Sequence, residues 1–98
     1  MAILSYRDRG SLDVARGINS KAARRVLPIG LHEVARRRLA FLSAGSSLDD
    51  LRSRAGLNLH ALTQDRIGQY AIRVNEQYRI CFLWKAPDAS DVQIGDYH

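Results

Sequence analysis

The sequence predicts an α+β domain, in which helices in the N-terminal part precede a small antiparallel sheet. Residues 68–98 alternate between apolar and polar side chains and are broken by turn residues, the pattern of half-buried antiparallel strands. Residues 28–44 place apolar side chains at helical spacing. A chain of 98 residues, 46% hydrophobic and 26% charged, is long enough for one core. We therefore expect residues 1–98 to form a single domain.

The predicted strands have one apolar face and one polar face, which we call the open face. The apolar face carries Tyr70, Ile72, Val74, Tyr78, Ile80, Phe82, Trp84, Val92 and Ile94. The open face carries Arg73, Arg79, Cys81 and Gln93. Residues 57–62 alternate in the same way and are the expected first strand, with His60 on the open face. A loop over residues 85–90 is expected before the last strand.

The loop between the two central strands decides how they pair. A two-residue loop places Ile72 opposite Arg79, which mixes apolar and charged side chains on one face. A three-residue loop, residues 75–77, pairs Ile72 with Ile80 and keeps the core face apolar. We therefore expect the three-residue loop.

The same register pairs Arg73 with Arg79 on the open face. Like charges directly opposite each other destabilise a sheet. Either the long side chains splay apart into water or toward acidic neighbours, or both guanidiniums hold the oxygens of a phosphate. The pair alone favours the first explanation.

The shorter elements are placed by their own signals. Residues 2–6 are an apolar run and are expected to be a strand, and residues 7–17 a short helix ended by its last glycine. The basic stretch 19–26 is either a linker or the start of the next helix. Ser47 is the expected cap of a short turn over residues 48–51.

The clearest helix spans residues 28–44, with Pro28 in its first turn and Gly45 after its end. Its apolar arc contains Leu31, Val34, Ala35, Leu39, Phe41 and Leu42. Arg38 lies near the middle of this arc. Either its stem packs while its charged head reaches solvent, or it lies at a seam that a partner covers. His32 is expected on the solvated surface.

The basic charge is concentrated in the N-terminal half. Thirteen of the 15 basic residues are arginine, the side chain suited to phosphates and acidic partners. Residues 1–58 carry 11 basic and 5 acidic residues, a net +6, and residues 59–98 carry 4 and 5, a net −1, which sum to +5. This asymmetry suggests a nucleic acid or an acidic protein as partner.

The expected compartment is the cytoplasm. Cys81 is the single cysteine, so it has no partner for an internal disulfide, which suits a reducing setting. The sequence shows no signal peptide and no apolar run long enough to span a bilayer. We therefore expect no membrane association.

The residues available for chemistry lie on the open face and at the chain end. No nucleotide-binding loop or zinc motif is present, and carboxylates are too few for a two-metal site, so no cofactor or metal is expected. Available side chains are His60, Arg73, Arg79, Tyr97 and His98. This inventory suits metal-free RNA cleavage. A base takes the 2′-hydroxyl proton, an acid protonates the leaving 5′-oxygen, and cations hold the charge on phosphorus.

Residues 68–84 (GQYAIRVNEQYRICFLW) and 91–98 (DVQIGDYH) resemble the HigB branch of the RelE/ParE toxin superfamily, toxins of bacterial type II toxin–antitoxin modules. Residues 34–42 (VARRRLAFL) and 48–53 (LDDLRS) resemble it too, whereas the first thirty residues match poorly. The resemblance implies N-terminal helices packed on a small antiparallel sheet. It also implies a ribosome-dependent mRNA endonuclease that inhibits translation. Its partners would be the ribosome, mRNA and a silencing HigA-like helix-turn-helix antitoxin, with the toxin monomeric outside that complex.

The resemblance assigns roles to individual residues. Arg79 matches the phosphate-handling arginine of the family, and His60 lies where relatives carry a functional His or Glu. Asp96, Tyr97 and His98 match the terminal catalytic group.

RNA binding is expected to involve further arginines. Thr63 replaces a lysine of some relatives, so Arg66 or Arg73 is expected to take over that phosphate contact. Arg36 and Arg37, on the long helix, are the remaining candidates. Two alternatives stay open: a ParE-like toxin that binds gyrase without nuclease chemistry, and a non-catalytic basic module that binds RNA or an acidic protein.

Overall fold

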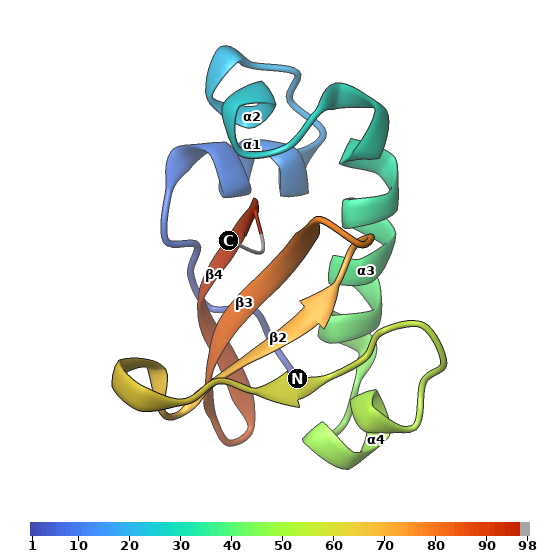
Figure 1. Cartoon of the computed structure of the whole chain (residues 1–98), viewed down its shortest axis with the longest axis vertical. Coiled ribbons are helices and arrows are strands. Elements are labelled where there is room, and N and C mark those ends of the chain that lie inside the picture. Colours follow the sequence, from blue (N-terminus) through green and yellow to red (C-terminus); the bar gives the residue numbers. More distant parts are fainter. Residues whose placement is uncertain (97–98) are drawn as a thin grey trace.

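The computed structural model describes residues 1–96, except for the side chain of Gln64, and has the predicted α+β fold (Figure 1). Within these residues the helices are α1 (Arg9–Arg16), α2 (Lys21–Val26), η1 (Ile29–Leu31, 3₁₀), α3 (His32–Ala44), α4 (Leu48–Arg52) and η2 (Gln64–Arg66, 3₁₀). The strands β1 (His60–Ala61), β2 (Gln69–Arg73), β3 (Tyr78–Lys85) and β4 (Asp88–Asp96) form an antiparallel sheet in the order β1-β2-β3-β4. Helices α1 and α2 stack at one end of the molecule, and α3 runs along the sheet (Figure 1). None of the described helices combines the length and the apolar character needed to cross a membrane.

Helices α1 and α2 are capped by their own flanking side chains. The Asp8 carboxylate accepts from the Ser11 N–H at 2.7 Å, and Gly17 ends α1 in the left-handed conformation with φ 74°. Ser20 begins α2 by accepting from the Ala23 N–H at 3.0 Å. The helix expected to end at Gly17 is therefore confirmed, and the stretch left open as linker or helix is largely a helix of its own.

The long helix begins later than predicted. Pro28 has an extended backbone with ψ 141°, and η1 separates it from α3, which begins at His32. The prediction that His32 is a solvated surface residue is wrong, because it is 4% exposed and its Nε2 lies 2.7 Å from the Leu27 carbonyl oxygen. A carbonyl oxygen only accepts, so Nε2 carries a proton and satisfies this carbonyl at the bend between α2 and α3.

Helix α3 and the apolar face of the sheet form the core. Leu39 and Leu42 of α3 pack with the predicted sheet residues Ile72, Val74, Ile80, Phe82 and Ile94. Phe41, which the apolar arc placed in this core, is instead 39% exposed. The open face lies on the other side of the sheet from α3.

The β2–β3 hairpin has the predicted three-residue loop. Arg73 pairs with Arg79, as that register requires. The side-chain oxygen of Asn75 accepts from the Gln77 and Tyr78 N–H groups at 2.9 and 2.8 Å. This local turn fixes the loop length and hence the register of the sheet.

A bulge in β4 keeps its apolar side chains on the core side. The register shifts between the pairs Cys81–Gln93 and Leu83–Ser90, and Asp91 takes up the extra position with φ 50°. Buried residues of β4 on either side of the bulge therefore face the same core.

Two further predicted boundaries were wrong. The expected strand over residues 57–62 shortens to His60–Ala61, because Asn58 has a left-handed φ of 49° that interrupts the extended run. The expected loop over residues 85–90 shortens to a tight turn, since β4 already begins at Asp88.

The N-terminal segment covers the outer edge of β4. Residues 2–6, predicted as a strand, form parallel bridges to β4 through Ile3 and Tyr6 rather than a continuous strand. The Arg7 N–H donates to the Val92 carbonyl oxygen at 2.9 Å. Backbone groups at the edge of β4 are thereby paired with the start of the chain.

Ser11 of α1 continues this cover. It is fully buried, and its hydroxyl oxygen accepts from the Ile94 N–H at 2.9 Å. A buried backbone donor needs such an acceptor. One side chain thus bonds α1 directly to β4.

Replacing Ser11 with alanine leaves the buried Ile94 N–H without its acceptor. We expect the free energy of unfolding to fall by about 1–3 kcal/mol, as measured by chemical denaturation. The control is Ser43→Ala, at an exposed position of α3. Equal stability of the two variants would show that the hydroxyl contributes nothing to this junction.

Gly10 sets how closely α1 approaches α2. A Cβ at Gly10 would lie 2.5 Å from the Ala22 carbonyl oxygen and 2.7 Å from Val26 Cγ1. We expect Gly10→Ala to lower the free energy of unfolding by about 1–3 kcal/mol through overpacking, as measured by thermal denaturation. This loss is expected although alanine is the better helix former. Gly30→Ala is the matched control, since a Cβ there meets nothing within 4 Å. A Gly10 variant as stable as the control would contradict the close approach.

Candidate active site

The open face aligns residues from β1 to β4 in rows. One row consists of His60, Ala71, Cys81 and Gln93, and the next of Arg73, Arg79 and Gly95. Cross-strand partners point to the same side of a sheet. His60, Arg73 and Arg79 therefore share the open face, as the sequence predicted.

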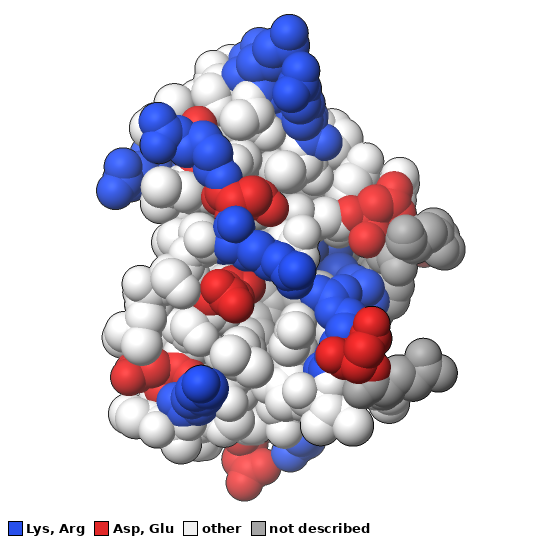
Figure 2. Space-filling view, turned by 90° about the vertical axis from the view of Figure 1, so that its left-hand side faces the viewer, with Lys and Arg blue, Asp and Glu red and all other residues white. Residues whose placement is uncertain are grey.

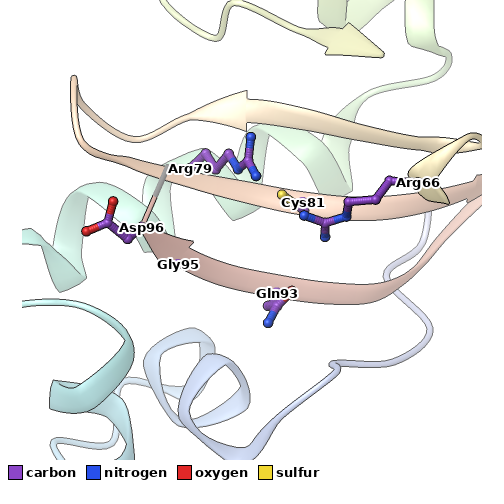
Figure 3. A pocket seen from close by; sticks show the side chains of 6 residues that line it. All are labelled: Arg66, Arg79, Cys81, Gln93, Gly95 and Asp96. Atoms are coloured by element: carbon purple, nitrogen blue, oxygen red, sulfur yellow. The ribbon is translucent and has the colours of Figure 1, made fainter. Parts of the chain in front are cut away.

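A hollow of about 370 Å³ occupies this face beside β4 (Figure 3). It is lined by Arg66, Arg79, Cys81, Gln93, Gly95 and Asp96. Arg66 enters from η2, and its guanidinium and that of Arg79 extend toward one another over Cys81 (Figure 3). Gly95 pairs with Arg79, and a Cβ at Gly95 would meet nothing within 4 Å, so the space beside Arg79 is open.

The three arginines of the open face are held differently. Arg66 Nη2 donates to Gln69 Oε1 at 3.1 Å, which holds the side chain over the hollow. Arg73 Nε donates to the Asn75 carbonyl oxygen at 3.2 Å, and Arg73 does not line the hollow. Arg73 thus turns toward its own hairpin loop, whereas Arg79 turns toward Arg66.

His60 lies on the same face but outside this lining. It is separated from Cys81 by β2, a distance of about 10 Å at the usual strand spacing. Its Nδ1 lies 3.0 Å from the Asn58 carbonyl oxygen. Because a carbonyl only accepts, Nδ1 carries the proton in the neutral imidazole and Nε2 is then the basic nitrogen.

The chain end begins at the rim of the hollow. Asp96 lines it from the last residue of β4 and accepts from Gln77 Nε2 at 2.9 Å. Tyr97 and His98, the remaining members of the predicted terminal group, lie outside the described residues.

Arg36 and Arg37 are not brought to the hollow. They lie on α3, which packs on the opposite side of the sheet. Arg36 Nη1 reaches to 3.5 Å from the Val14 carbonyl oxygen in α1, and Arg37 is exposed. The predicted RNA-binding set therefore divides between two sides of the molecule.

Sequence reasoning missed Arg7. An adjoining hollow of about 360 Å³ is lined by Arg7, Asp65, Arg66, Gln69 and Gln93. Because Arg66 and Gln93 line both hollows, the two form one continuous surface. The apolar run at residues 2–6 was the available signal, since pairing it with β4 brings Arg7 beside Gln93.

The charges around the hollows favour a small or extended anion over a broad polyanionic surface. On the face that Figure 2 shows, basic side chains lie between acidic ones rather than in an uninterrupted patch. Arg66 and Arg79 converge on one space, where guanidinium forks match the oxygens of a phosphate. Among residues 1–96, no group of three or more His, Cys, Asp and Glu side chains is arranged to hold a metal ion.

Comparison with known proteins places these features in a family context. A family model described as the RelE-like toxin of the type II toxin–antitoxin system HigB matches residues 13–98. An uncharacterised protein of Haemophilus influenzae is 31% identical over 68 residues, which cover 69% of this chain and 67% of that protein. The solved structure of a YoeB/ParE toxin from Agrobacterium tumefaciens superposes with a TM-score of 0.59 at 13% identity, over 100% of both chains. That likeness shows a shared fold.

Proposed function

The chain belongs to the HigB-like toxins, RelE-like toxins of type II toxin–antitoxin systems, and from this premise we propose that it is an endoribonuclease that cuts mRNA on the ribosome. The observation that carries the proposal is the convergence of Arg66 and Arg79 over an open hollow at the start of the terminal Asp96-Tyr97-His98 group. Its partners would be the ribosome, mRNA and a HigA-like antitoxin.

The proposed chemistry is transfer of the phosphate to the neighbouring 2′-oxygen. A base accepts the 2′-hydroxyl proton, the 2′-oxygen bonds to phosphorus, and the bond from phosphorus to the 5′-oxygen breaks. An acid then protonates the leaving 5′-oxygen, which gives a 2′,3′-cyclic phosphate and a 5′-hydroxyl. Arg79 stabilises the negative charge that develops on the phosphate oxygens. The step balances without an oxidant or reductant.

We propose that His60 and the terminal residues Tyr97 and His98 carry out the proton transfers. The hydrogen bond from His60 Nδ1 to the Asn58 carbonyl oxygen makes Nε2 of His60 the nitrogen that accepts the 2′-hydroxyl proton. His60 lies across β2 from the hollow, so this role requires the scissile nucleotide to lie over β2, with its 2′-hydroxyl toward His60 and its phosphate toward Arg79. Tyr97 and His98 follow Asp96 and are proposed to supply the acid at the leaving oxygen.

The adjoining hollow suggests the path of the RNA. Arg66 borders both hollows, and Arg7 borders the second, so a strand bound at Arg79 continues past Arg66 toward Arg7. Phosphates along this path would meet successive guanidiniums. Asp65 and Asp96 at the rims disfavour phosphates placed off the path.

The proposed path predicts how binding of short single-stranded RNA depends on salt. Arg66→Ala and Arg79→Ala should each weaken binding and reduce the slope of log affinity against log salt by about 0.7, the value for one lost phosphate contact. Fluorescence anisotropy with a labelled oligonucleotide measures both quantities. The control is Arg36→Ala with Arg37→Ala, on the other side of the sheet, which should leave the slope unchanged. A slope flattened only by the α3 variants would place RNA on α3 instead.

Cleavage itself is tested with ribosome-bound message. Arg79→Ala should reduce the single-turnover rate by roughly two to three orders of magnitude, because a preorganised donor to the charged phosphate is lost. Arg52→Ala removes an exposed arginine of α4 and should cut at the wild-type rate. Deletion of His98 should cost roughly two to four orders of magnitude, the scale of a positioned acid or base.

Excess chelator should leave these cleavage rates unchanged when magnesium is kept just high enough to hold the ribosomes intact. If the His98 deletion cuts as fast as the wild type, the terminal group is not the active site. Absence of any cutting by the wild type would favour a toxin that acts by binding alone.

A further inference from the structure

Another hollow lies on α3, on the other side of the sheet from the open face. Its volume is about 230 Å³, and it is lined by Val34, Arg37, Arg38 and Phe41. The guanidinium carbon of Arg54 lies 5.3 Å from the centre of the Phe41 ring. We call these five residues the α3 arginine pocket. It combines an exposed aromatic ring, an aliphatic side chain and three guanidiniums.

The guanidiniums of this pocket are incompletely satisfied. Among the described residues, Nε of Arg38 and Nε of Arg54 are buried and have no hydrogen-bond partner. Nearly all buried donors in folded proteins are paired, and leaving a charged donor unpaired is costly. These Nε atoms are too deeply buried to meet a partner themselves, so an added acceptor would bind the Nη groups of the same guanidiniums; the Arg54 side chain is 38% exposed.

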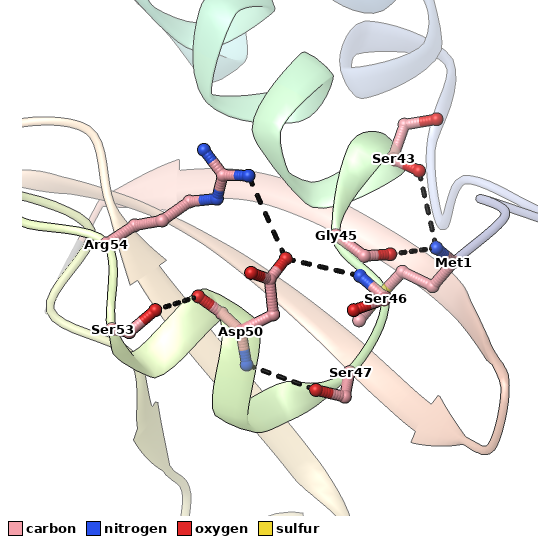
Figure 4. Close-up of polar contacts among 8 residues, drawn as sticks. All are labelled: Met1, Ser43, Gly45, Ser46, Ser47, Asp50, Ser53 and Arg54. Carbon is pink, nitrogen blue, oxygen red and sulfur yellow. Dashed lines mark hydrogen bonds and ion pairs between the residues drawn. The ribbon is translucent and has the colours of Figure 1, made fainter.

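Arg54 is also tied to α4 by an ion pair. Its Nη2 lies 3.8 Å from Asp50 Oδ2, which also accepts from the Ser46 N–H at 3.2 Å (Figure 4). This network anchors the guanidinium to α4 while its Nε stays unpaired. The side chain is therefore held in place before any ligand arrives.

The head of Arg38 is directed toward the loop after α4. Its Nη1 lies 3.7 Å from the position of a Cβ on Gly56, where φ is 87°. Arg38 is half-buried, so its head does not simply extend into solvent. The alternative in which Arg38 lies at a seam covered by a partner fits this arrangement.

We propose that the α3 arginine pocket binds an acidic segment of the antitoxin, with a carboxylate at Arg38 and Arg54 and an apolar neighbour against Phe41. A carboxylate supplies two acceptors to guanidinium forks. Arginine and aromatic side chains are the groups that dominate protein–protein contacts. Membership in a toxin–antitoxin family implies that the protein partner is an antitoxin. The proposal does not depend on the nuclease activity.

Two features favour a protein carboxylate over RNA phosphate. Arg54 already lies over the Phe41 ring, which limits stacking of a base on that side. The Asp50 carboxylate lies 3.8 Å from Arg54, and its negative charge would repel a run of phosphates more strongly than a single carboxylate.

The test measures binding of the antitoxin encoded by the reading frame beside the toxin gene, by titration calorimetry with the full toxin. Arg38→Glu and Phe41→Ala should each raise the dissociation constant at least about tenfold. Arg37→Glu should also raise the dissociation constant, and because Arg37 is exposed this variant should fold normally. The control Arg52→Ala should stay within about twofold of the wild type. Circular dichroism and thermal melts identify any variant that fails to fold.

Overlapping peptides that cover the antitoxin, with and without Asp and Glu replaced by Asn and Gln, test the carboxylate. The proposal is supported if one peptide binds the wild type and loses binding on replacement or with Arg38→Glu. It is overturned if Arg37→Glu and the other folded variants bind antitoxin as tightly as the wild type. It is also overturned if these variants lose RNA affinity while antitoxin affinity is unchanged, since phosphate would then be the occupant.

Discussion

The outer edge of β4 is the constraint on which the arrangement of this molecule depends. A strand edge exposes backbone donors and acceptors, and buried ones must be paired. Here the pairing comes from the N-terminal residues, through Arg7 to Val92 and then through the Ser11 hydroxyl to Ile94. The same contacts place α1 at the end of the sheet and bring Arg7 to the adjoining hollow. The N-terminal contacts that protect the edge of β4 therefore also bring Arg7 to the candidate site.

The open face tolerates a charge arrangement that the core face could not. Arg73 and Arg79 are directly opposite, which costs a sheet roughly 0.2–1 kcal/mol when like charges stay together. The two side chains relieve this by diverging, Arg73 toward the Asn75 carbonyl and Arg79 toward the hollow. The two side chains thus splay apart, and the proposed anion site consists of Arg79 with Arg66 of η2 rather than with its cross-strand neighbour Arg73.

The sequence predicted the parts of the fold that local rules decide. Alternation and the need for an apolar core face predicted the hairpin register, and helical spacing predicted Leu39 and Leu42 as core residues. It failed where distant segments meet. Nothing near His32 indicates that a bend will bury it against the Leu27 carbonyl, and nothing near Ser11 indicates its bond to β4.

The candidate site shows the same division. Arg79 and Arg73 were placed on their face by parity within a hairpin, which is a local property. Arg7 reaches the site through a contact across nearly the whole chain. Arg36 and Arg37 were predicted to bind RNA from charge alone, and charge carries no information about which side of the sheet their helix will cover.

The two arginine-rich surfaces lie on opposite sides of the sheet, and this separation limits how an antitoxin can silence the toxin. A segment seated only in the α3 arginine pocket leaves the hollow at Arg79 uncovered. If both proposals hold, inhibition requires either a segment long enough to pass around the sheet or a complex too bulky for the ribosome. The second route needs no contact with Arg79, and it would leave the hollow free to bind short RNA while keeping the toxin off the ribosome. Binding of a short single-stranded RNA by the intact complex, measured beside the free toxin, would therefore distinguish exclusion by bulk from direct blocking of the hollow.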